Sequence, residues 1–463
     1  MQPLGQRQND RPVQRLTAVD LINLYVETPS APTRVGALAI LDGRRLVDSS
    51  GRLRLAAIRE VIGRRLDGVP RLRQIIHRPG PLAGRPVWAD DPCFRLDRHV
   101  QQLALTPGQD LTDLAMHLVT SPLDRAHPLW RMWFVTGLPG GDVALVFGMH
   151  HVVADGITTV RVVGSLMDGP PLGERQPAAR PWVAQPPRRW GALVLENLRG
   201  RRSGWRGPPL GQWRRMMRMR SAPRTSLNQP VGAHRRLAAI TMDLAAAKDV
   251  AHRYHGKIND VVLAVAAGGV RRLLQGRSER VDGVRVHVSV AVSLRPSAVE
   301  GEVGNRSGGI ALRVPLDADP HARLREIARE SAEAKSDQLP TVGNTLLVWL
   351  ARIGLLRYFS RHQRMINIVE SNVVGPPATV SLLGAPVRSI TPVGTLAGNL
   401  SLGFLALSYA GRLTIAVQAD ADQYPDLPVL LAAMERDCSA LLAKPTSVAP
   451  PPPPVAPGHL PLR

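Results

Sequence analysis

The sequence predicts an α/β protein built from two regions in which strands and helices alternate. Its 463 residues suffice for two or three domains, and 44% of them are apolar, which allows a large core. Strand-like and helix-like patterns alternate on both sides of a stretch rich in Pro, Gly, Arg and Trp. We therefore expect one subdomain over residues 16–168, a second over 227–443, and a crossover over 169–226.

The two ends of the chain lack the patterns of packed elements. Residues 1–15 are polar, and the tail 444–463 carries five consecutive prolines that begin at Pro450. Proline has no backbone N–H group to donate to a helix or a sheet, so such a run does not pack as either. We expect both ends to be disordered.

The first region carries the patterns of buried strands and amphipathic helices. Continuous apolar runs over Val35–Leu41 and Val143–His151 are expected to be strands that are covered on both faces. Helical spacing of apolar residues predicts helices over Leu55–Leu66, Asp110–Val119 and Ile157–Met167. This order of elements is typical of a layered α/β domain.

The second region repeats the alternation with a larger number of elements. Apolar spacing predicts helices over Leu244–Tyr254, Ile258–Leu274, Pro320–Ser336 and Leu427–Leu442. Strands are expected over Val284–Ser293, Ile310–Val314, Leu402–Tyr409 and Leu413–Ala419. The apolar stretch Leu346–Phe359 is interrupted by Arg352 and Arg357 and is too short to span a membrane, so we interpret it as an amphipathic or core helix.

Charge and cysteine content restrict the class of protein. The formal net charge of +22 fits a basic solvated surface, an anionic membrane, nucleic acid, or a polyanionic ligand such as coenzyme A (CoA). Cys93 and Cys438 are the only cysteines, so neither a disulfide framework nor a cysteine-based zinc site is expected. The N-terminus lacks the apolar core of a signal peptide, and we expect a cytoplasmic protein.

The crossover contains an unusually basic segment. Arg188–Arg220 holds ten arginines against one acid, Glu196, together with Trp190, Trp205 and Trp213. One interpretation is a solvated linker. A second is an interfacial membrane segment, with guanidinium groups on lipid phosphates and indole rings at the headgroup boundary. Binding to single-stranded nucleic acid ranks third, because no motif of a nucleic-acid-binding fold accompanies the segment.

The histidine pair His150-His151, followed by Asp155-Gly156, is the most informative motif. It lies where a predicted buried strand ends and a helix begins, and consecutive strand residues point to opposite faces. One imidazole should therefore face a cleft while the other packs inward. A pair of buried structural histidines is one interpretation. A metal site needs converging ligands, which adjacent histidines do not provide, so no metal is expected. Base catalysis by a neutral imidazole is the third interpretation.

The pattern HHxxxDG at 150–156 resembles the active-site motif of the CoA-dependent acyltransferase superfamily. That superfamily includes chloramphenicol acetyltransferase, peptide-synthetase condensation domains and wax ester synthases. Further segments resemble the wax ester synthase/diacylglycerol acyltransferase family: Pro128-Leu129-Trp130, the NDVVLA segment that begins at Asn259-Asp260, and SNVVGP from Ser371-Asn372 to Gly375-Pro376, in which Val374 replaces a proline. The opening LTAVDLINLYVETPSAPTRVGALAIL and GRPVWADDPCFRLDRHV at 84–100 are also similar, so the resemblance spans roughly residues 16–442.

The resemblance implies a fold and roles for the motif residues. It implies two chloramphenicol-acetyltransferase-like subdomains, each a mixed sheet with helices, and an active-site channel between them. His151 would be the catalytic base and His150 its support. Asp155 would pair with an arginine and fix the geometry, and Gly156 would leave room for substrate.

The other motifs are expected to contribute to substrate binding. These residues are Pro128, Leu129, Trp130, Asn259, Asp260, Ser371, Asn372 and Gly375. Asn259 also fits an ordinary helix N-terminus, and the Ser371 segment also fits a simple turn. Both interpretations stay open for these two segments.

The function implied is that of an acyl-CoA-dependent O-acyltransferase. It would esterify diacylglycerol or a long-chain alcohol, making triacylglycerol or wax ester, with acyl-CoA as co-substrate and no cofactor. We expect a peripheral enzyme at the inner face of the plasma membrane or on lipid inclusions, with no nucleic-acid partner. One alternative is a condensation-type acyltransferase that uses carrier-protein substrates. Another is a non-catalytic lipid-binding or lipid-droplet protein on the same fold.

Overall fold

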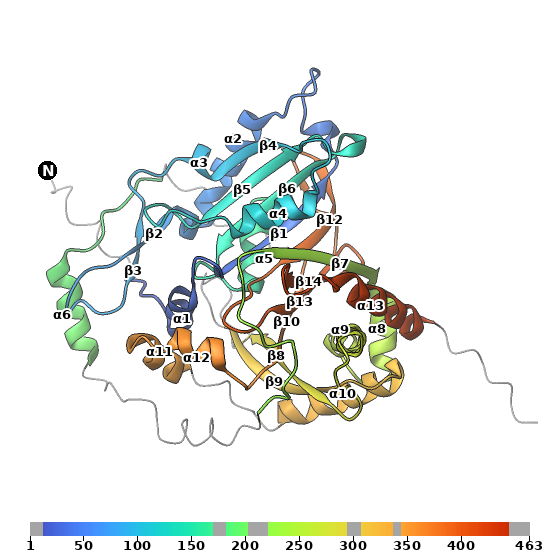
Figure 1. The fold of residues 1–463 in the computed structure, drawn as a ribbon. Coiled ribbons are helices and arrows are strands. Elements are labelled where there is room, and N and C mark those ends of the chain that lie inside the picture. The colour runs from blue at the N-terminus through green and yellow to red at the C-terminus, as the bar shows by residue number, and fades with distance from the viewer. Residues whose placement is uncertain (1–12, 170–181, 202–220, 294–306, 337–343, 444–463) are drawn as a thin grey trace, which may run out of the picture.

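The computed structural model describes residues 13–169, 182–201, 221–293, 307–336 and 344–443. Two six-stranded sheets form its framework, and helices cover them (Figure 1). The predicted α/β class is confirmed. The tail 444–463 lies outside the described residues, as do residues 1–12, whereas Arg15 forms a bridge with Val87 and so does not share the disorder expected for 1–15.

The first sheet has the strand order β11-β12-β1-β6-β5-β4. Its strands are β1 (Arg34–Leu41), β4 (Val100–Ala104), β5 (Trp130–Thr136), β6 (Val143–His150), β11 (Ser381–Leu382) and β12 (Ala385–Val393). β1 pairs antiparallel with both β6 and β12, and β4 pairs parallel with β5. Every residue of β6 is buried, as its continuous apolar run predicts.

The second sheet has the order β7-β14-β13-β10-β8-β9. Its strands are β7 (Arg235–Asp243), β8 (Arg285–Ser293), β9 (Ser307–Pro315), β10 (Ile368–Val374), β13 (Leu402–Tyr409) and β14 (Arg412–Asp420). β10 lies centrally and pairs parallel with both β8 and β13, while the other neighbours are antiparallel. A third sheet contains only β2 (Gln74–His77) and β3 (Val87–Asp90).

Helices pack against both sheets. In the first half they are α1 (Ala18–Val26), α2 (Leu55–Arg65), α3 (Leu96–His99), α4 (Leu111–Thr120), α5 (Gly156–Ser165) and α6 (Trp190–Arg201). In the second half they are α8 (Leu244–Arg253), α9 (Ile258–Gly276), α10 (Pro320–Ser336), α11 (Asn344–Arg352), α12 (Leu356–His362) and α13 (Leu427–Leu442). Short 3-10 turns lie at Gly43–Arg45, Leu66–Gly68, Pro70–Arg73 and Pro139–Gly141.

A strand from the second half completes the first sheet. β12 lies within the range 227–443 expected for the second subdomain, yet it pairs with β1 through the register Gly36↔Val393 to Leu41↔Val387. The two regions expected to be separate therefore share a sheet. A strand pattern indicates that a segment is extended and half-buried, but it carries no information on which sheet it joins.

Two segments differ in detail from their sequence interpretation. The stretch Leu346–Phe359 forms parts of α11 and α12 rather than one helix, because Gly354 has φ 77° and breaks the helical path. The basic crossover contains α6, whose Leu193 is buried against Ala83 and Val87. Residues 170–181 and 202–220, with Trp205 and Trp213, lie outside the described residues. Where the chain is described, no helix combines the length and the apolar character needed to cross a membrane.

Candidate active site

His151 lies at the wall of a cavity between the two sheets. It directly follows β6, and its ring lines a space of about 380 Å³. Residues of β1, β6 and α5 line the cavity on one side, and residues of β8, β9, β10 and β13 line it on the other. Most of these residues are apolar, for example Phe147 and Leu405, so the cavity suits an apolar chain.

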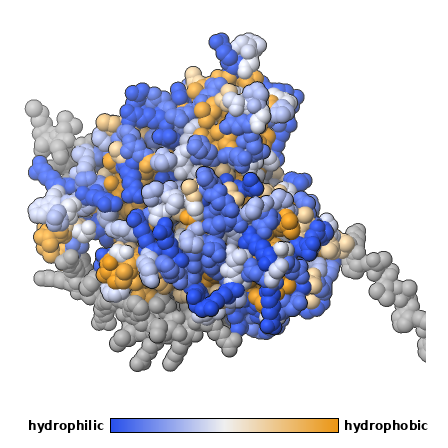
Figure 2. All heavy atoms as spheres, viewed as in Figure 1, coloured by the Kyte–Doolittle hydropathy of each residue, from blue (hydrophilic) through white to orange (hydrophobic). Residues whose placement is uncertain are grey.

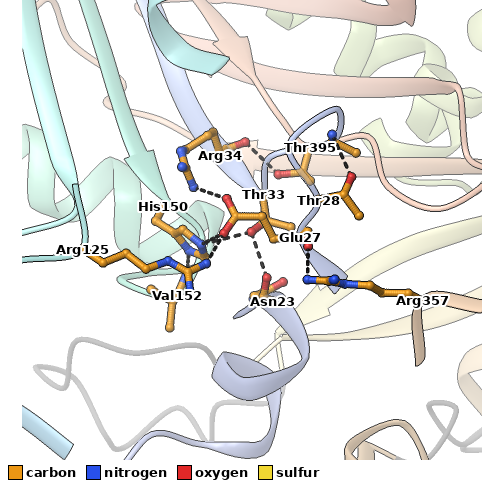
Figure 3. A network of polar contacts seen from close by, with 11 residues as sticks. Asn23, Glu27, Thr28, Thr33, Arg34, Arg125, His150, Val152, Arg357 and Thr395 are labelled. Atoms are coloured by element: carbon orange, nitrogen blue, oxygen red, sulfur yellow. Dashed lines mark hydrogen bonds and ion pairs between the residues drawn. The ribbon is translucent and has the colours of Figure 1, made fainter. Parts of the chain in front are cut away.

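Segments at the start of the chain hold His151 in place. Its backbone N–H donates to the carbonyl of Thr33 over 2.9 Å. The side-chain amide of Asn23, on α1, lies 3.4 Å from its Nδ1. Thr33 in turn donates its hydroxyl to the backbone carbonyl of Asn23 over 2.9 Å (Figure 3). α1, the segment before β1 and His151 are thus joined by hydrogen bonds.

His150 is fully buried and points away from the cavity. Its Nδ1 accepts the backbone N–H of Val152 over 3.0 Å, so a neutral ring carries its proton on Nε2. Nε2 lies 3.2 Å from a carboxylate oxygen of Glu27 and 3.3 Å from the hydroxyl of Thr33 (Figure 3). Burial lowers the pKa of His150 to about 4, so the ring is neutral near pH 7.

Glu27 is the centre of a buried polar network. One oxygen accepts from Arg34 and the other from Arg125, each over 2.6 Å (Figure 3). Burial alone would raise its pKa, but the hydrogen bond with His150 and the two guanidinium groups lower the pKa of Glu27 to about 2. The second half contributes as well, because Arg357 donates to the Glu27 carbonyl over 2.8 Å. The network thus holds His150, the buried member of the histidine pair, in place.

Asp155 and Gly156 form the start of α5. A carboxylate oxygen of Asp155 accepts the backbone N–H of Thr158 over 2.9 Å, which caps the helix. At Gly156 a β-carbon would lie only 3.0 Å from Cγ2 of Val373 on β10. Gly156 also lines the cavity, so its lack of a side chain lets the first half approach the second sheet beside His151.

The structure places Pro128-Leu129-Trp130, which we predict to bind substrate, within the core. All three residues are buried, and none lines the cavity. The Trp130 indole donates to the Leu72 carbonyl over 2.7 Å and stacks on His99 at 4.6 Å between ring centroids. The Leu129 carbonyl accepts the backbone N–H of His150 over 2.9 Å. The motif therefore supports the histidine strand from within the core.

Asn259 and Asp260 are not among the residues that line the cavity, but Asn259 interacts with Glu370, which is one of them. Asp260 is buried in the first turn of α9, where it accepts the backbone N–H of Lys257 and the hydroxyl of Ser331, each over 2.7 Å. These contacts of Asp260 are those of a helix start. Asn259 lies near Glu370 of β10 and favours the charged form of that carboxyl group.

The Ser371 segment is divided between strand and turn. Ser371 and Val373 lie on β10 and line the cavity, as the channel interpretation expects. Asn372 and Gly375 are not among the lining residues. At Gly375 a β-carbon would lie 2.4 Å from the Ser408 carbonyl oxygen, so the glycine permits the close approach of two backbones.

Sequence reasoning missed the residues that support the histidines from other elements. Glu27, Asn23 and Thr33 all lie in the opening segment that carries part of the family resemblance, but the resemblance did not assign them roles. Arg125 lies upstream of the Pro128 motif. Their contribution depends on contacts that only the fold brings together. Sequence reasoning also missed Glu370, which lines the cavity from β10, although an acid within a mainly apolar strand is a recognisable signal.

The described part of the chain does not bring its common metal-ligating side chains together. No group of three or more His, Cys, Asp and Glu side chains within it is placed to hold a metal ion. Cys93 is exposed, and neither it nor Cys438 lines the cavity.

Two family models match the chain. The wax ester synthase/diacylglycerol acyltransferase catalytic domain matches residues 16–262. The C-terminal domain of the same family matches residues 303–441. Together the matched ranges include the histidine motif, the first turn of α9 and the strand that carries Ser371.

Relatives with similar sequences come from mycobacteria. A protein of Mycobacterium tuberculosis (strain H37Rv), provisionally named a diacylglycerol O-acyltransferase, is 30% identical over 451 residues, which cover 90% of this chain and 87% of the relative. A second protein of that strain with a provisional name of the same kind is 30% identical over 431 residues, covering 88% and 91%.

Solved structures share the fold. The wax ester synthase/diacylglycerol acyltransferase from Marinobacter aquaeolei VT8 aligns with a TM-score of 0.66 and 22% identity, over 92% of this chain and 98% of that chain. The first condensation domain of the calcium-dependent antibiotic synthetase aligns with a TM-score of 0.61 and 16% identity, over 94% and 98%. These structures share the fold, and the family models and relatives show that the chain is an O-acyltransferase belonging to the wax ester synthase/diacylglycerol acyltransferase family.

Proposed function

We propose that this enzyme transfers an acyl group from acyl-CoA to the hydroxyl group of a diacylglycerol or a long-chain alcohol, with His151 as general base. The observation that carries the proposal is the position of His151 on the wall of an apolar cavity lined by both sheets. A long acyl chain and a lipid alcohol both need such a surface. The names of the mycobacterial relatives support diacylglycerol as an acceptor.

The proposed reaction requires one proton to move twice. A ring nitrogen of His151 removes the proton from the acceptor hydroxyl as its oxygen attacks the thioester carbonyl carbon. The tetrahedral intermediate collapses, the C–S bond breaks, and the leaving CoA sulfur takes the proton back from the imidazolium. No acyl-enzyme forms, which agrees with the position of both cysteines away from the cavity lining. General-base help of this kind is worth about 10²–10⁴ in rate.

The lipid substrates also call for a surface that meets a membrane or a lipid inclusion. Exposed apolar side chains gather on α6, where Trp190, Leu195 and Leu198 are each about half exposed (Figure 2). A second group, Ile353, Leu355 and Tyr358, lies at α11 and α12 (Figure 2). We propose that these two groups bind lipid, with neighbouring arginines contacting anionic headgroups.

The lipid-binding proposal is tested by sedimentation with liposomes that contain phosphatidylglycerol. The double variant Leu195→Ser/Leu198→Ser should bind several-fold more weakly than the unmodified protein. Val429→Ser is a matched control, because Val429 is an exposed apolar residue on α13, on the opposite side of the molecule from α6 in Figure 1. Equal binding by the double variant and the unmodified protein would contradict the role of α6.

The enzymatic proposal is tested by resolving lipid products. Purified protein is incubated with labelled palmitoyl-CoA and either diolein or hexadecanol, and His151→Ala serves as the inactive reference. Labelled triacylglycerol or wax ester should appear only with His151 present. Transfer from acyl-carrier protein but not from palmitoyl-CoA would instead support a condensation-type enzyme. Bound lipid without any product would support a non-catalytic lipid-binding protein.

A further inference from the structure

We infer that Asn23 is a positioning residue that holds His151 in the tautomer a general base needs. The inference rests on the proposed function, because it concerns how the same imidazole is prepared for proton removal. Asn23 does not line the cavity, and it acts through the histidine rather than on substrate. Neither the histidine motif nor the other matched segments assign it a role.

The position of Asn23 is set by local structure. It lies in the second turn of α1, a helix capped by Thr17 through a capping box. α1 packs against α11 and α12 of the second half, and Asn23 is half-buried. The backbone carbonyl of Asn23 accepts a hydrogen bond from the hydroxyl of Thr33, and the backbone carbonyl of Thr33 accepts one from the backbone N–H of His151. The amide is thereby held beside the imidazole ring.

The contact between Asn23 and His151 matters because a neutral imidazole has two tautomers, and only one leaves Nε2 free to act as a base. A neutral ring carries one proton, so one nitrogen donates a hydrogen bond and the other accepts one. The amide of Asn23 lies beside Nδ1, at 3.4 Å. If Nδ1 carries the proton, Nε2 has the free lone pair that can remove a proton from the acceptor hydroxyl. A partner that accepts from Nδ1–H therefore stabilises the active tautomer.

The amide of Asn23 can act as that acceptor after a half-turn. The atom at 3.4 Å is the amide nitrogen, and rotation about the terminal torsion places Oδ1 at the same position. In the orientation with nitrogen toward the ring, the amide would donate to Nδ1 and leave the proton on Nε2, which blocks the base. The two orientations thus have opposite consequences for catalysis, and we assign the oxygen-facing one to the active enzyme.

Substitutions at position 23 separate the two orientations. Asn23→Asp offers only acceptor oxygens, so it should keep kcat within a few-fold of the unmodified enzyme. Asn23→Leu offers neither donor nor acceptor and should lower kcat about 10- to 100-fold with KM nearly unchanged, a smaller loss than removal of the base itself. Tyr25→Leu, at an exposed position on the same helix, should keep full turnover.

A second readout does not depend on turnover. The nitrogen chemical shifts of His151, in protein with ¹⁵N-labelled histidine and assigned by comparison with His151→Ala, report which nitrogen carries the proton. We expect the proton on Nδ1 in the unmodified protein and in Asn23→Asp, and a mixture of tautomers in Asn23→Leu.

Three results would each overturn the inference. They are a proton on Nε2 in the unmodified protein, full turnover by Asn23→Leu in an enzyme that His151→Ala inactivates, and turnover by Asn23→Asp as low as that of Asn23→Leu. An unmodified protein without any transferase activity would contradict the proposed function, and the chemical shifts would still decide the tautomer.

Discussion

Two buried glutamates lie in the two halves of the molecule and differ in charge. Glu27, beside the histidine motif, has its pKa lowered to about 2 and is ionised. Glu370, on β10 of the second sheet, has its pKa raised to about 8 by burial and is mainly protonated at pH 7. Both carboxyl groups are almost inaccessible to solvent, so burial alone does not explain the difference.

The difference lies in the partners that each half provides. Glu27 accepts hydrogen bonds from Arg34 and Arg125. It also accepts one from His150, because the neutral His150 ring carries its proton on Nε2. Among the described residues, only the Asn259 side chain favours the charged form of Glu370, and neither carboxyl oxygen has a partner with good hydrogen-bond geometry. The Glu370 side chain lies beside the cavity, among apolar residues of α9 and neighbouring strands. A buried carboxylate persists only where donors replace water. The first half is therefore built to hold charge near the motif, and the second half is not.

Breaking the paired glutamate should have the largest effect on stability. Glu27→Leu leaves Arg34 buried without its counter-ion, which costs about 3–5 kcal/mol in the free energy of unfolding. The urea midpoint should fall accordingly at pH 7. Glu60→Leu, which removes an exposed pair with Arg64, should change the midpoint little. Equal effects of the two substitutions would contradict the proposed importance of the network.

Replacing the unpaired glutamate should have a smaller effect of opposite sign. Glu370→Gln removes a group whose carboxyl proton is retained in the folded state but lost from the unfolded chain. This should stabilise the protein at pH 7 by on the order of 3 kcal/mol, less the cost of packing an amide there. Glu435→Gln, at an exposed position, is the matched control. A lower urea midpoint for Glu370→Gln would mean that the carboxyl has a partner it needs.

The pH dependence of stability should separate the two regions. Glu27 and His150 have lowered pKa values, so their contribution is lost as the pH falls, from about 6.5 to 4 for His150 and from 4.5 to 2 for Glu27. The pKa of Glu370 is raised, so its contribution falls as the pH rises from 4.5 to about 8. Urea midpoints across pH 4–9 should show a flatter alkaline side in Glu370→Gln and an unchanged acid side. A steeper alkaline side in that variant would contradict the assignment.

The contact between the two halves at Gly156 should give the smallest change. Gly156→Ala places a β-carbon 3.0 Å from Val373, which requires a shift of a few tenths of an ångström between α5 and β10. We expect a loss of about 1–2 kcal/mol in stability and a reduced turnover. The paired variant Gly156→Ala/Val373→Ala should recover part of both. No recovery would show that the contact with Val373 is not the cause.

Local elements were predictable from the sequence, whereas long-range partners were not. The run Val143–His151 and the helix from Ile258 are observed nearly as predicted, because apolar periodicity reports burial directly. The position of His151 at a cavity also agrees with the motif. The joining of β12 to the first sheet, the buried position of Trp130 and the partners of Glu27 all depend on tertiary packing, which no local pattern encodes.

The central claim is that the His151 imidazole removes the proton from the acceptor alcohol within the shared cavity. The most direct measurement is the initial rate of product formation from palmitoyl-CoA by His151→Ala, beside the exposed-site control His117→Ala, both with native circular dichroism. The account predicts a loss of about 10²–10⁴-fold for the first variant and a normal rate for the second. A folded His151→Ala enzyme that works at the rate of the control would contradict it.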